Sequence, residues 1–465
     1  MKRLTLLAVA LTMVLGMAAT SFAAPEVTIS GNVLVNAVWR DNWDFASGND
    51  GVEKSSKEMN IRERADLYFT VTANENLKAV LGFRSVRGDW GQAGMLADSS
   101  GGTPSENTIG LRDAYIDFNW PGTSVNVKAG LMPIGLPAAV GGASMVHNAR
   151  TTGVLVSSPI TDNVSILAGF ARAGDANDDA SVSKTDDSVI DNWIVALPLN
   201  FEGFAMSPYF MYAPMGVNAG LAADAAVVGL TNRAYSGQTP SIYDADAIKS
   251  AWWLGTDFTM SMFDPFVLKA DLNYGTVDGE KEIYDRSGWL FDIALDYTGF
   301  DFMNLSLTYA YTTGEDDDAT NGSERLPVLI NDWAIGSFWF GGGLITGDDL
   351  DSDSDNIGFH AVALSATGIQ SFAEGLTHDA HIVYAKGTND KKMTGKVYGA
   401  TLTEEDAMWE VDFNTMYKIY DELTLYNGIG YINLDYDKDT WATGADSNGD
   451  GGDAWKFQLG MVYQF

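Results

Sequence analysis

Apolar residues recur at every second position in segment after segment of the chain from Val27 to its last residue. The final segment is the clearest case, because one parity holds only apolar residues: Trp455, Phe457, Leu459, Met461, Tyr463 and Phe465. The other parity is polar or glycine except for Val462. Successive side chains of a strand point to opposite faces, so each segment predicts a β-strand with one apolar and one wetter face.

Short turns and long loops separate these segments in strict alternation. The short turns contain the Gly, Pro, Asn and Asp that tight turns require, and they fall at 74–76, 121–122, 202–203, 264–265, 299–301 and 421–422. The longer segments are rich in Gly, Asp and Ser, and they fall at 41–59, 88–107, 132–150, 173–188, 214–249, 278–287, 314–355, 389–404 and 438–453.

This alternation predicts an all-β fold, a transmembrane antiparallel β-barrel with short periplasmic turns and long extracellular loops. With weaker hairpins at 152–172 and 356–388, the segments give about eighteen strands. A count of sixteen stays open, because 152–172 or the stretch 333–346 could be misassigned. The alternative is a large soluble all-β protein, but such proteins seldom keep one hydrophobic parity over so many strands without covering helices.

The amino terminus has the form of a secretory signal peptide. Basic Lys2 and Arg3 precede an apolar run, and small residues follow at the positions that a signal peptidase reads. We expect cleavage after Ala23, which leaves residues 24–465 as the barrel domain. No later stretch has the length of an apolar transmembrane helix, and the chain has no cysteine for disulfide or thiol chemistry.

The charge balance is strongly acidic, with 28 basic and 62 acidic residues and a net charge of −34. Without Lys2 and Arg3 the balance is 26 against 62, or −36. Nucleic acid is excluded as a partner because its binding requires a basic face. Aromatic residues make up 12% of the chain, which argues against disorder.

Two internal stretches carry a family resemblance. Residues 111–118, LRDAYIDF, and 127–137, VKAGLMPIGLP, together with the two termini, resemble the homotrimeric outer-membrane porins of sulfate-reducing deltaproteobacteria. The resemblance implies a trimer of water-filled barrels in the bacterial outer membrane. It also implies that the terminal Phe465 is read by the barrel-assembly machinery.

The same resemblance implies that the third loop, residues 132–150, folds into the lumen and narrows it. We expect Pro133, Pro137 and His147 in this constriction loop. General diffusion porins carry acidic residues in that loop, opposite an arginine cluster, whereas residues 132–148 contain no acid here. Glycine and proline equally suit a loop that lies outside the barrel.

Strand parity predicts which charged residues face the lumen. A basic group gathers near the start of the third loop: Arg62, Arg64, Arg84 and Lys128. Acidic residues are expected on the opposing walls: Asp113, Asp117, Asp292, Asp296, Glu410 and Asp412. Arg87 and Arg112 have the other parity, which assigns them to the rim or to a subunit contact.

Two interpretations of these charges remain open. The charged residues pair with one another and keep the lumen wet, or the arginines form a constriction that favours small anions such as sulfate. We therefore predict a porin for passive diffusion of small hydrophilic solutes and ions. A substrate-selective channel and a non-conducting structural or adhesive barrel are the alternatives.

The acidic loops suggest weak calcium sites. Asp446, Asn448 and Asp450 match the start of an EF-hand loop, with Asp453 nearby, but Phe457 stands where the bidentate glutamate belongs. The alternatives are a solvated acidic loop and loose bridging by divalent ions to lipopolysaccharide. No other cofactor is expected.

Catalytic function is not expected. His378 and His381 are three apart on a predicted strand, so they point to opposite faces and cannot share a metal. The chain also lacks the sequence motifs of serine hydrolases, P-loop enzymes and zinc peptidases.

Overall fold

The structure is a computed structural model. It describes residues 25–42, 58–85, 88–90, 109–175, 189–215, 248–318, 320–329, 333–338, 340, 358–393, 402–435, 437, 440 and 452–465. The predicted signal peptide lies outside these residues. Among them, no helix is long and apolar enough to cross a membrane.

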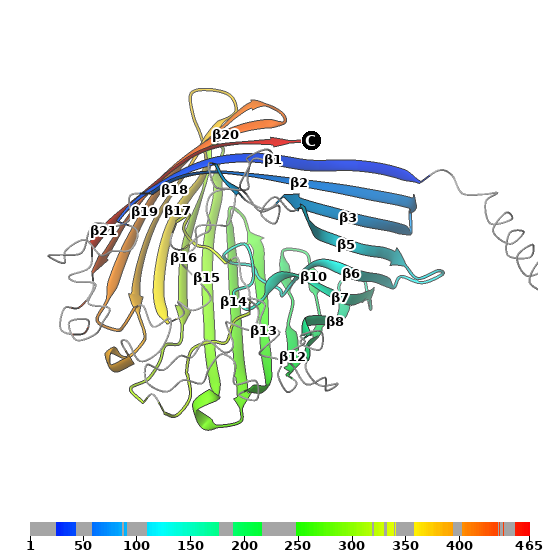
Figure 1. Cartoon of the computed structure of the whole chain (residues 1–465), viewed down its shortest axis with the longest axis horizontal. Helices are drawn as coiled ribbons and strands as arrows, with labels where there is room; N and C mark the ends of the chain where they lie inside the picture. The colour runs from blue at the N-terminus through cyan, green and yellow to red at the C-terminus, as the bar shows by residue number, and fades with distance from the viewer. Residues whose placement is uncertain are drawn as a thin grey trace, which may run out of the picture.

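The described residues form one antiparallel sheet (Figure 1). Its strands are β1 (Glu26–Asp41), β2 (Glu58–Asn74), β3 (Leu77–Ser85), β4 (Gly88–Asp89), β5 (Ile109–Asn119), β6 (Asn126–Gly135), β7 (Asn148–Pro159), β8 (Ser165–Asp175), β9 (Val189–Ala196), β10 (Leu199–Phe201), β11 (Phe204–Met206), β12 (Tyr209–Pro214), β13 (Ile248–Phe263), β14 (Phe266–Gly279), β15 (Arg286–Phe300), β16 (Met303–Thr312), β17 (Phe359–Gln370), β18 (Leu376–Gly387), β19 (Ala407–Tyr420), β20 (Leu423–Asp435) and β21 (Gly452–Gln464). Two short 3-10 helices, η2 (Glu282–Tyr284) and η3 (Lys391–Met393), lie between strands.

Three barrel strands are each divided in two. Pro198 separates β9 from β10, and Pro208 separates β11 from β12, because proline has no N–H to donate to the ladder. The peptide N–H of Leu197 instead donates to the carbonyl of Pro208, at 2.9 Å. β4 pairs with β2 next to β3. Counted in this way, the described strands form a closed barrel of 18 strands, which confirms the larger of the two predicted counts.

The barrel closes between its first and last strands. β1 pairs with β21 from Asn32 opposite Gln464 to Asp41 opposite Trp455. Beyond this ladder, Gly31 and Phe465 exchange two backbone hydrogen bonds of 2.9 and 3.1 Å. The last residue of the chain therefore completes the seam.

The predicted hairpins are present, including the two weaker ones, which are β7–β8 and β17–β18. The stretch 333–346, whose assignment the sequence leaves open, does not form a hairpin strand in its described part. Residues 333–338 and 340 form no strand, and they pack inside the barrel instead.

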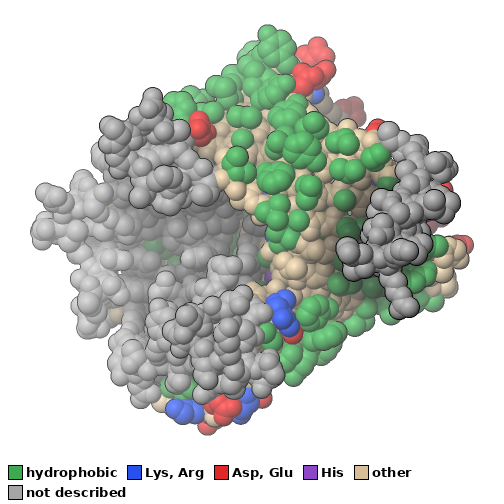
Figure 2. Space-filling model, turned by 45° about the vertical axis from the view of Figure 1, so that its right-hand side comes forward, with side chains coloured by type: hydrophobic (Ala, Val, Ile, Leu, Met, Phe, Trp, Pro, Cys, Tyr) green, Lys and Arg blue, Asp and Glu red, His purple; other side chains and the backbone are tan. Residues whose placement is uncertain are grey.

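The outer surface carries two rows of aromatic rings, as strand parity predicts. At the end with the long loops, neighbouring strands bring together ring pairs such as Trp252–Tyr274, Tyr274–Trp289, Tyr384–Trp409 and Tyr431–Trp455. At the end with the short turns, the pairs include Phe204–Phe258, Phe266–Tyr297 and Phe300–Phe302. Hydrophobic side chains spread over the outer face shown in Figure 2. Such girdles match the two interfaces of a bilayer.

The sheet separates locally where β6 approaches the third loop. Its pairing with β5 ends at Ala114 opposite Leu131, whereas its pairing with β7 continues to Gly135 opposite Asn148. Just before the separation, Gly130 has φ of +131°, a conformation that residues with a Cβ rarely adopt. The end of the β6–β7 hairpin is thus released from β5 and bends into the barrel.

We predict that Gly130→Ala destabilises the barrel by about 1–3 kcal/mol. An added Cβ would lie 2.1 Å from the carbonyl oxygen of Ala114, and the backbone conformation would be strained as well. The measurement is the temperature at which the folded, fast-migrating form is lost on electrophoresis. Gly142→Ala is the control, because its φ is also positive but its Cβ would meet no atom within 4 Å. Equal losses in the two variants would show that the close approach at Gly130 does not matter.

Candidate functional site

The third loop crosses the lumen. It runs from the end of β6 to the start of β7, and the peptide N–H groups of Ala139 and Val140 donate to the two carboxylate oxygens of Asp271, at 2.8 and 2.9 Å. Asp271 lies on the inner face of β14, which is six strands away from β6 around the barrel. The structure therefore places this loop inside the barrel.

A second segment also folds inward after β16, and its described residues are 313–318, 320–329, 333–338 and 340. The N–H of Leu329 donates to the carbonyl of Val146 at 2.8 Å, and the N–H of Ala334 donates to Gly141 at 3.0 Å. The indole N–H of Trp253 on β13 donates to the carbonyl of Pro327 at 2.8 Å. Sequence reasoning placed this segment in a long polar loop and missed its role. The signal was its unusual apolar content, LPVLINDWAIGSFWF at 326–340.

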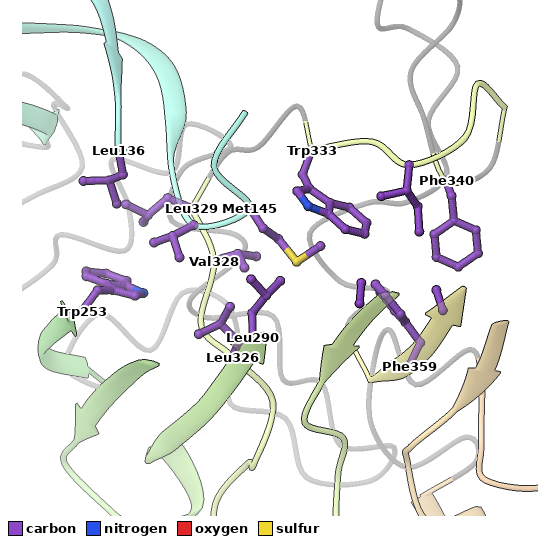
Figure 3. Close-up of a cluster of buried hydrophobic side chains, with 14 of the residues drawn as sticks. Leu136, Met145, Trp253, Leu290, Leu326, Val328, Leu329, Trp333, Phe340 and Phe359 are labelled. Atoms are coloured by element: carbon purple, nitrogen blue, oxygen red, sulfur yellow. The ribbon is translucent and has the colours of Figure 1, made fainter. Parts of the chain in front are cut away.

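The two segments build a hydrophobic core within the lumen (Figure 3). Met145 and Leu136 come from the third loop, and Trp333 and Phe340 from the second segment. They pack with side chains from the inner faces of the strands, which include Trp253, Leu290 and Phe359. Removal of this much apolar surface from water stabilises both segments in their inward positions.

Buried carboxylates on the barrel wall hold the second segment. Asp292 on β15 accepts from the indole N–H of Trp333 at 2.9 Å. Glu410 on β19 accepts from the backbone N–H groups of Phe338 and Phe340 at 3.1 and 3.0 Å. Asp412 accepts from the N–H of Ser337 at 2.9 Å.

This arrangement corrects part of the sequence interpretation. Asp292, Glu410 and Asp412 were predicted to form an acidic wall of the pore, but their exposure is at most 1%. The inward segments cover them, a contact between distant parts of the chain that strand parity cannot reveal. Asp296 is different, because it stays partly exposed and pairs with Lys269 at 2.9 Å.

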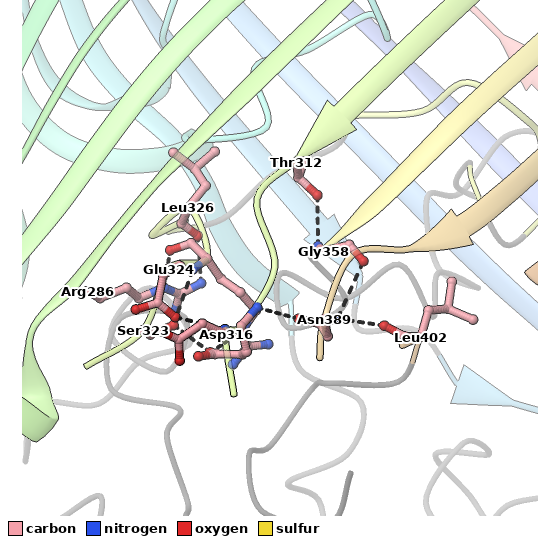
Figure 4. A network of polar contacts seen from close by, with 11 residues as sticks. Arg286, Thr312, Asp316, Ser323, Glu324, Leu326, Gly358, Asn389 and Leu402 are labelled. Carbon is pink, nitrogen blue, oxygen red and sulfur yellow. Dashed lines mark hydrogen bonds and ion pairs between the residues drawn. The ribbon is translucent and has the colours of Figure 1, made fainter. Parts of the chain in front are cut away.

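A polar network fixes the base of the second segment (Figure 4). The guanidinium of Arg286 on β15 donates to the carbonyls of Arg325 and Leu326, at 2.9 and 2.6 Å. Arg325 forms a buried ion pair of 2.8 Å with Glu315. Asn389, from the segment after β18, accepts from the N–H of Glu315 and donates to the carbonyl of Leu402.

The predicted basic residues gather on the inner faces of β2, β3 and β6. Arg84 on β3 donates two hydrogen bonds to Asp66 on β2, at 2.5 and 2.7 Å, and Arg64 lies 3.5 Å from the same carboxylate. Lys128 on β6 lies two strands away. We call the following set the basic wall: Arg62, Arg64, Lys78, Arg84, Arg112, Lys128 and Arg150.

Asp113 and Asp117 lie within the basic wall rather than opposite it. Their strand, β5, runs between β3 and β6, so their partners come from adjacent strands. Asp117 is 3.4 Å from Lys78 and 3.9 Å from Lys128. Asp113 is 3.2 Å from Arg150, which the end of the β6–β7 hairpin carries inward. The prediction of an opposing wall was wrong for these two residues.

Arg112 was assigned to the rim or a subunit contact, and the structure corrects this too. The β3–β5 register passes from Gly82 opposite Asp113 to Phe83 opposite Leu111, which leaves Arg112 in a β-bulge. A bulge redirects one side chain relative to strand parity. Arg112 is half-buried, within electrostatic range of Arg84, Arg150 and Asp66. Arg87 lies outside the described residues.

The charges of the basic wall are unequally exposed. The side chains of Lys78, Lys128, Arg150 and Arg84 are 47, 44, 34 and 27% exposed. Their partners Asp66, Asp113 and Asp117 are only 3, 4 and 10% exposed. Water in the lumen therefore meets mainly the cations of this wall.

The remaining predicted residues lie as follows. In the third loop region Pro133 is exposed on β6, Pro137 is partly buried, and His147 is buried. Of the calcium candidates, Asp446, Asn448 and Asp450 lie outside the described residues. Asp453 is described, and it accepts a hydrogen bond from Asn433 at 2.7 Å.

Solved structures offer one comparison with known proteins. No protein-family model and no curated protein matches the sequence. The improved crystal structure of Pseudomonas aeruginosa OprD is similar, with a TM-score of 0.52 and 12% identity over 94% of this chain and 95% of that one. P. aeruginosa OccK11 (OpdR) has a TM-score of 0.51 and 11% identity over 94 and 96% of the two chains. Acinetobacter baumannii OccAB4 has a TM-score of 0.51 and 11% identity over 94 and 98%.

The chain has the fold of these proteins. At such low identity the likeness concerns the fold alone. The deltaproteobacterial resemblance of the sequence stays a prediction, because these structures come from Pseudomonas and Acinetobacter.

We predict that Glu410→Ala releases the second inward segment. Loss of this carboxylate leaves the backbone N–H groups of Phe338 and Phe340 without their buried acceptor, at a cost of about 1–3 kcal/mol for each unsatisfied group. The measurement is susceptibility of the purified barrel to limited proteolysis between residues 313 and 357. Asp296→Ala is the control, since that carboxylate binds no inward segment. Unchanged cleavage in Glu410→Ala would contradict the anchoring role.

The third loop should weaken in acid because of His147. Burial lowers the pKa of His147 to about 4 from the ordinary value of 6.5. As the pH falls from 6.5 to 4, the unfolded imidazole gains a proton that the folded one does not, so the folded state loses up to about 3 kcal/mol of stability. We expect the unfolding temperature of the wild type to fall more steeply over this range than that of His147→Leu. Parallel decreases would show that the pKa of His147 is the same in the folded and unfolded states.

Proposed function

We propose that the chain is an outer-membrane channel that passes small hydrophilic solutes passively and favours small anions, sulfate among them. The exposed cations of the basic wall carry this proposal. Among the described ion pairs of this wall, the carboxylates of Asp66, Asp113 and Asp117 are buried, whereas the side chains of Lys78, Arg84 and Arg150 that pair with them are partly exposed. A narrow lumen with low-dielectric walls focuses the field of such charges and enriches the solute of opposite sign.

The inward segments strengthen the proposed preference for anions. Four carboxylates on the strands facing the basic wall, Asp271, Asp292, Glu410 and Asp412, are buried against backbone N–H groups, an indole N–H or each other. Their charges are offset locally by those donors and are withdrawn from the water of the lumen. The basic wall consequently faces a surface with far less negative charge than the sequence suggests.

The wider biological setting is part of the same proposal. The fold supports a location in the outer membrane, reached through the predicted leader at 1–23 and with Phe465 as the assembly signal. A homotrimer of the deltaproteobacterial type and contact with lipopolysaccharide remain proposals. Loose calcium binding at the acidic loops also remains one.

A substrate-selective channel is the second candidate function. Two inward segments narrow the lumen, rather than the third loop alone, and both are fixed by a hydrophobic core. A more constricted path discriminates between solutes more strongly than a wide pore does. A series of solutes of increasing size in a liposome-swelling assay separates this candidate from general diffusion. In general diffusion the rate of entry falls with solute size, whereas a selective channel admits one chemical class faster than its size predicts.

The proposal predicts that Arg62→Gln with Arg84→Gln lowers the anion-to-cation permeability ratio by about threefold or more. Loss of roughly 0.7 kcal/mol of attraction at the narrow region is enough for that change. Release of Asp66 from Arg84 acts in the same direction. The measurement is the reversal potential in a salt gradient across a planar bilayer.

Lys269→Gln is the control for position, compared with Arg84→Gln alone, because each removes one inward cation but Lys269 lies on the opposite side of the barrel. A ratio unchanged in the double variant would refute the anion preference. Absence of any conductance from the wild type would instead favour the structural or adhesive barrel.

A further inference from the structure

One outward-facing lysine stands out among the lysines that the structure describes. Each of the others contacts a carboxylate or an aromatic ring, the residues being Lys78, Lys128, Lys249, Lys269, Lys281, Lys391, Lys392, Lys418 and Lys456. Lys386 has no ion-pair partner within the described residues, although it is exposed. It shares the outer parity of Ile382 and Tyr384, so its stem lies on the lipid-facing surface.

The register places two polar rings beside Lys386. Tyr311 on β16 is opposite His360 on β17, which is opposite Lys386 on β18. The three outward side chains therefore form a row across three adjacent strands, with neighbours about 5 Å apart. The rings of Tyr311 and His360 have centroids 4.8 Å apart.

The hydrogen-bond pattern of His360 leaves one ring nitrogen for a ligand. The hydroxyl of Tyr309 lies 2.8 Å from Nδ1. When that hydroxyl donates, the imidazole proton resides on Nε2, which becomes a donor. Together with the ammonium of Lys386 and the hydroxyl of Tyr311, it gives three donors in one row. Such a set suits an anion with several acceptor oxygens.

The next row toward the middle of the barrel is aromatic. Tyr309, Val362, Tyr384 and Trp409 are in register on β16 to β19, and the rings of Tyr384 and Trp409 are 4.7 Å apart. This row belongs to the girdle at the end with the long loops. A ligand held here would place its anionic group at Lys386 and its sugar or upper acyl portion against the aromatic rings.

We propose that this patch, consisting of Tyr309, Tyr311, His360, Tyr384, Lys386 and Trp409, binds a phosphate of lipid A, the phosphorylated glycolipid of lipopolysaccharide. The choice follows from charge complementarity and depth. Within the described residues no carboxylate lies at ion-pair distance from Lys386, so an anionic group at that depth complements its charge, and the outer leaflet of an outer membrane supplies phosphorylated sugars there. The inference rests on the proposed outer-membrane location but is independent of what the channel passes.

The test uses the purified full-length protein and the double variant Lys386→Ala with His360→Ala. The probe is fluorescent lipid A that carries both phosphates, titrated in detergent, with dephosphorylated lipid A and phosphatidylglycerol in parallel. We expect the double variant to bind the phosphorylated probe at least about tenfold more weakly, which corresponds to about 1.4 kcal/mol. The wild type should bind dephosphorylated lipid A as weakly as the variant binds the phosphorylated form.

Lys418→Ala is the charge-matched control. Lys418 pairs with Asp421 and lies on β19 near the short-turn end of the barrel, whereas Lys386 lies near the long-loop end. Heat-modifiable electrophoretic mobility and unchanged ion selectivity verify that each variant is folded and conducts normally. Equal affinity of the wild type and the double variant would overturn the site. Equal affinity of the wild type for phosphatidylglycerol and lipid A would overturn the assignment to lipid A. A wild type that binds lipid A but fails to conduct would refute the proposed channel and leave this site standing.

Discussion

The hydrogen-bonding requirement of the backbone governs this molecule. In hydrocarbon each unpaired N–H or C=O costs several kcal/mol, so a sheet that spans a bilayer must close on itself. β1 and β21 meet this requirement, and the two bonds between Gly31 and Phe465 extend the seam to the last residue. Because β1 and β21 pair antiparallel like all the other neighbours, the number of strands is even. Contact with hydrocarbon requires apolar side chains at the outward positions. The outward apolar face is the pattern that is visible in the sequence.

The same requirement shapes the inside. A chain segment that enters the lumen brings backbone N–H groups that need acceptors when water is displaced. Carboxylates on the inner faces of β14 and β19 supply them at Asp271, Glu410 and Asp412. Each becomes part of a folded interior, with the hydrophobic core of the two inward segments packed beside it. Acidic residues that seemed to belong to a pore thereby become structural.

Much of the fold could be predicted because its determinants are local. Alternation assigns the faces, turn residues mark the short connections, and parity correctly turns Arg62, Arg64 and Arg84 inward. Prediction failed where a determinant was not local. The β-bulge at Arg112 depends on how β5 meets β3, and the burial of Glu410 depends on a segment some 70 residues away in sequence. The apolar run at 326–340 was the only local sign of that contact.

The pairing of charges within the basic wall does not cancel its field, because the partners differ in length. An aspartate oxygen stays close to the strand that carries it, whereas lysine and arginine stems extend several bonds further before their charge begins. Asp66, Asp113 and Asp117 are therefore covered, and the cations they orient reach the water. Each pair adds a dipole whose positive end points into the lumen, and the excess of cations adds to it. Pairing with carboxylates and exposure of the cations to water therefore occur together in this wall, so the two interpretations of its charges do not exclude each other.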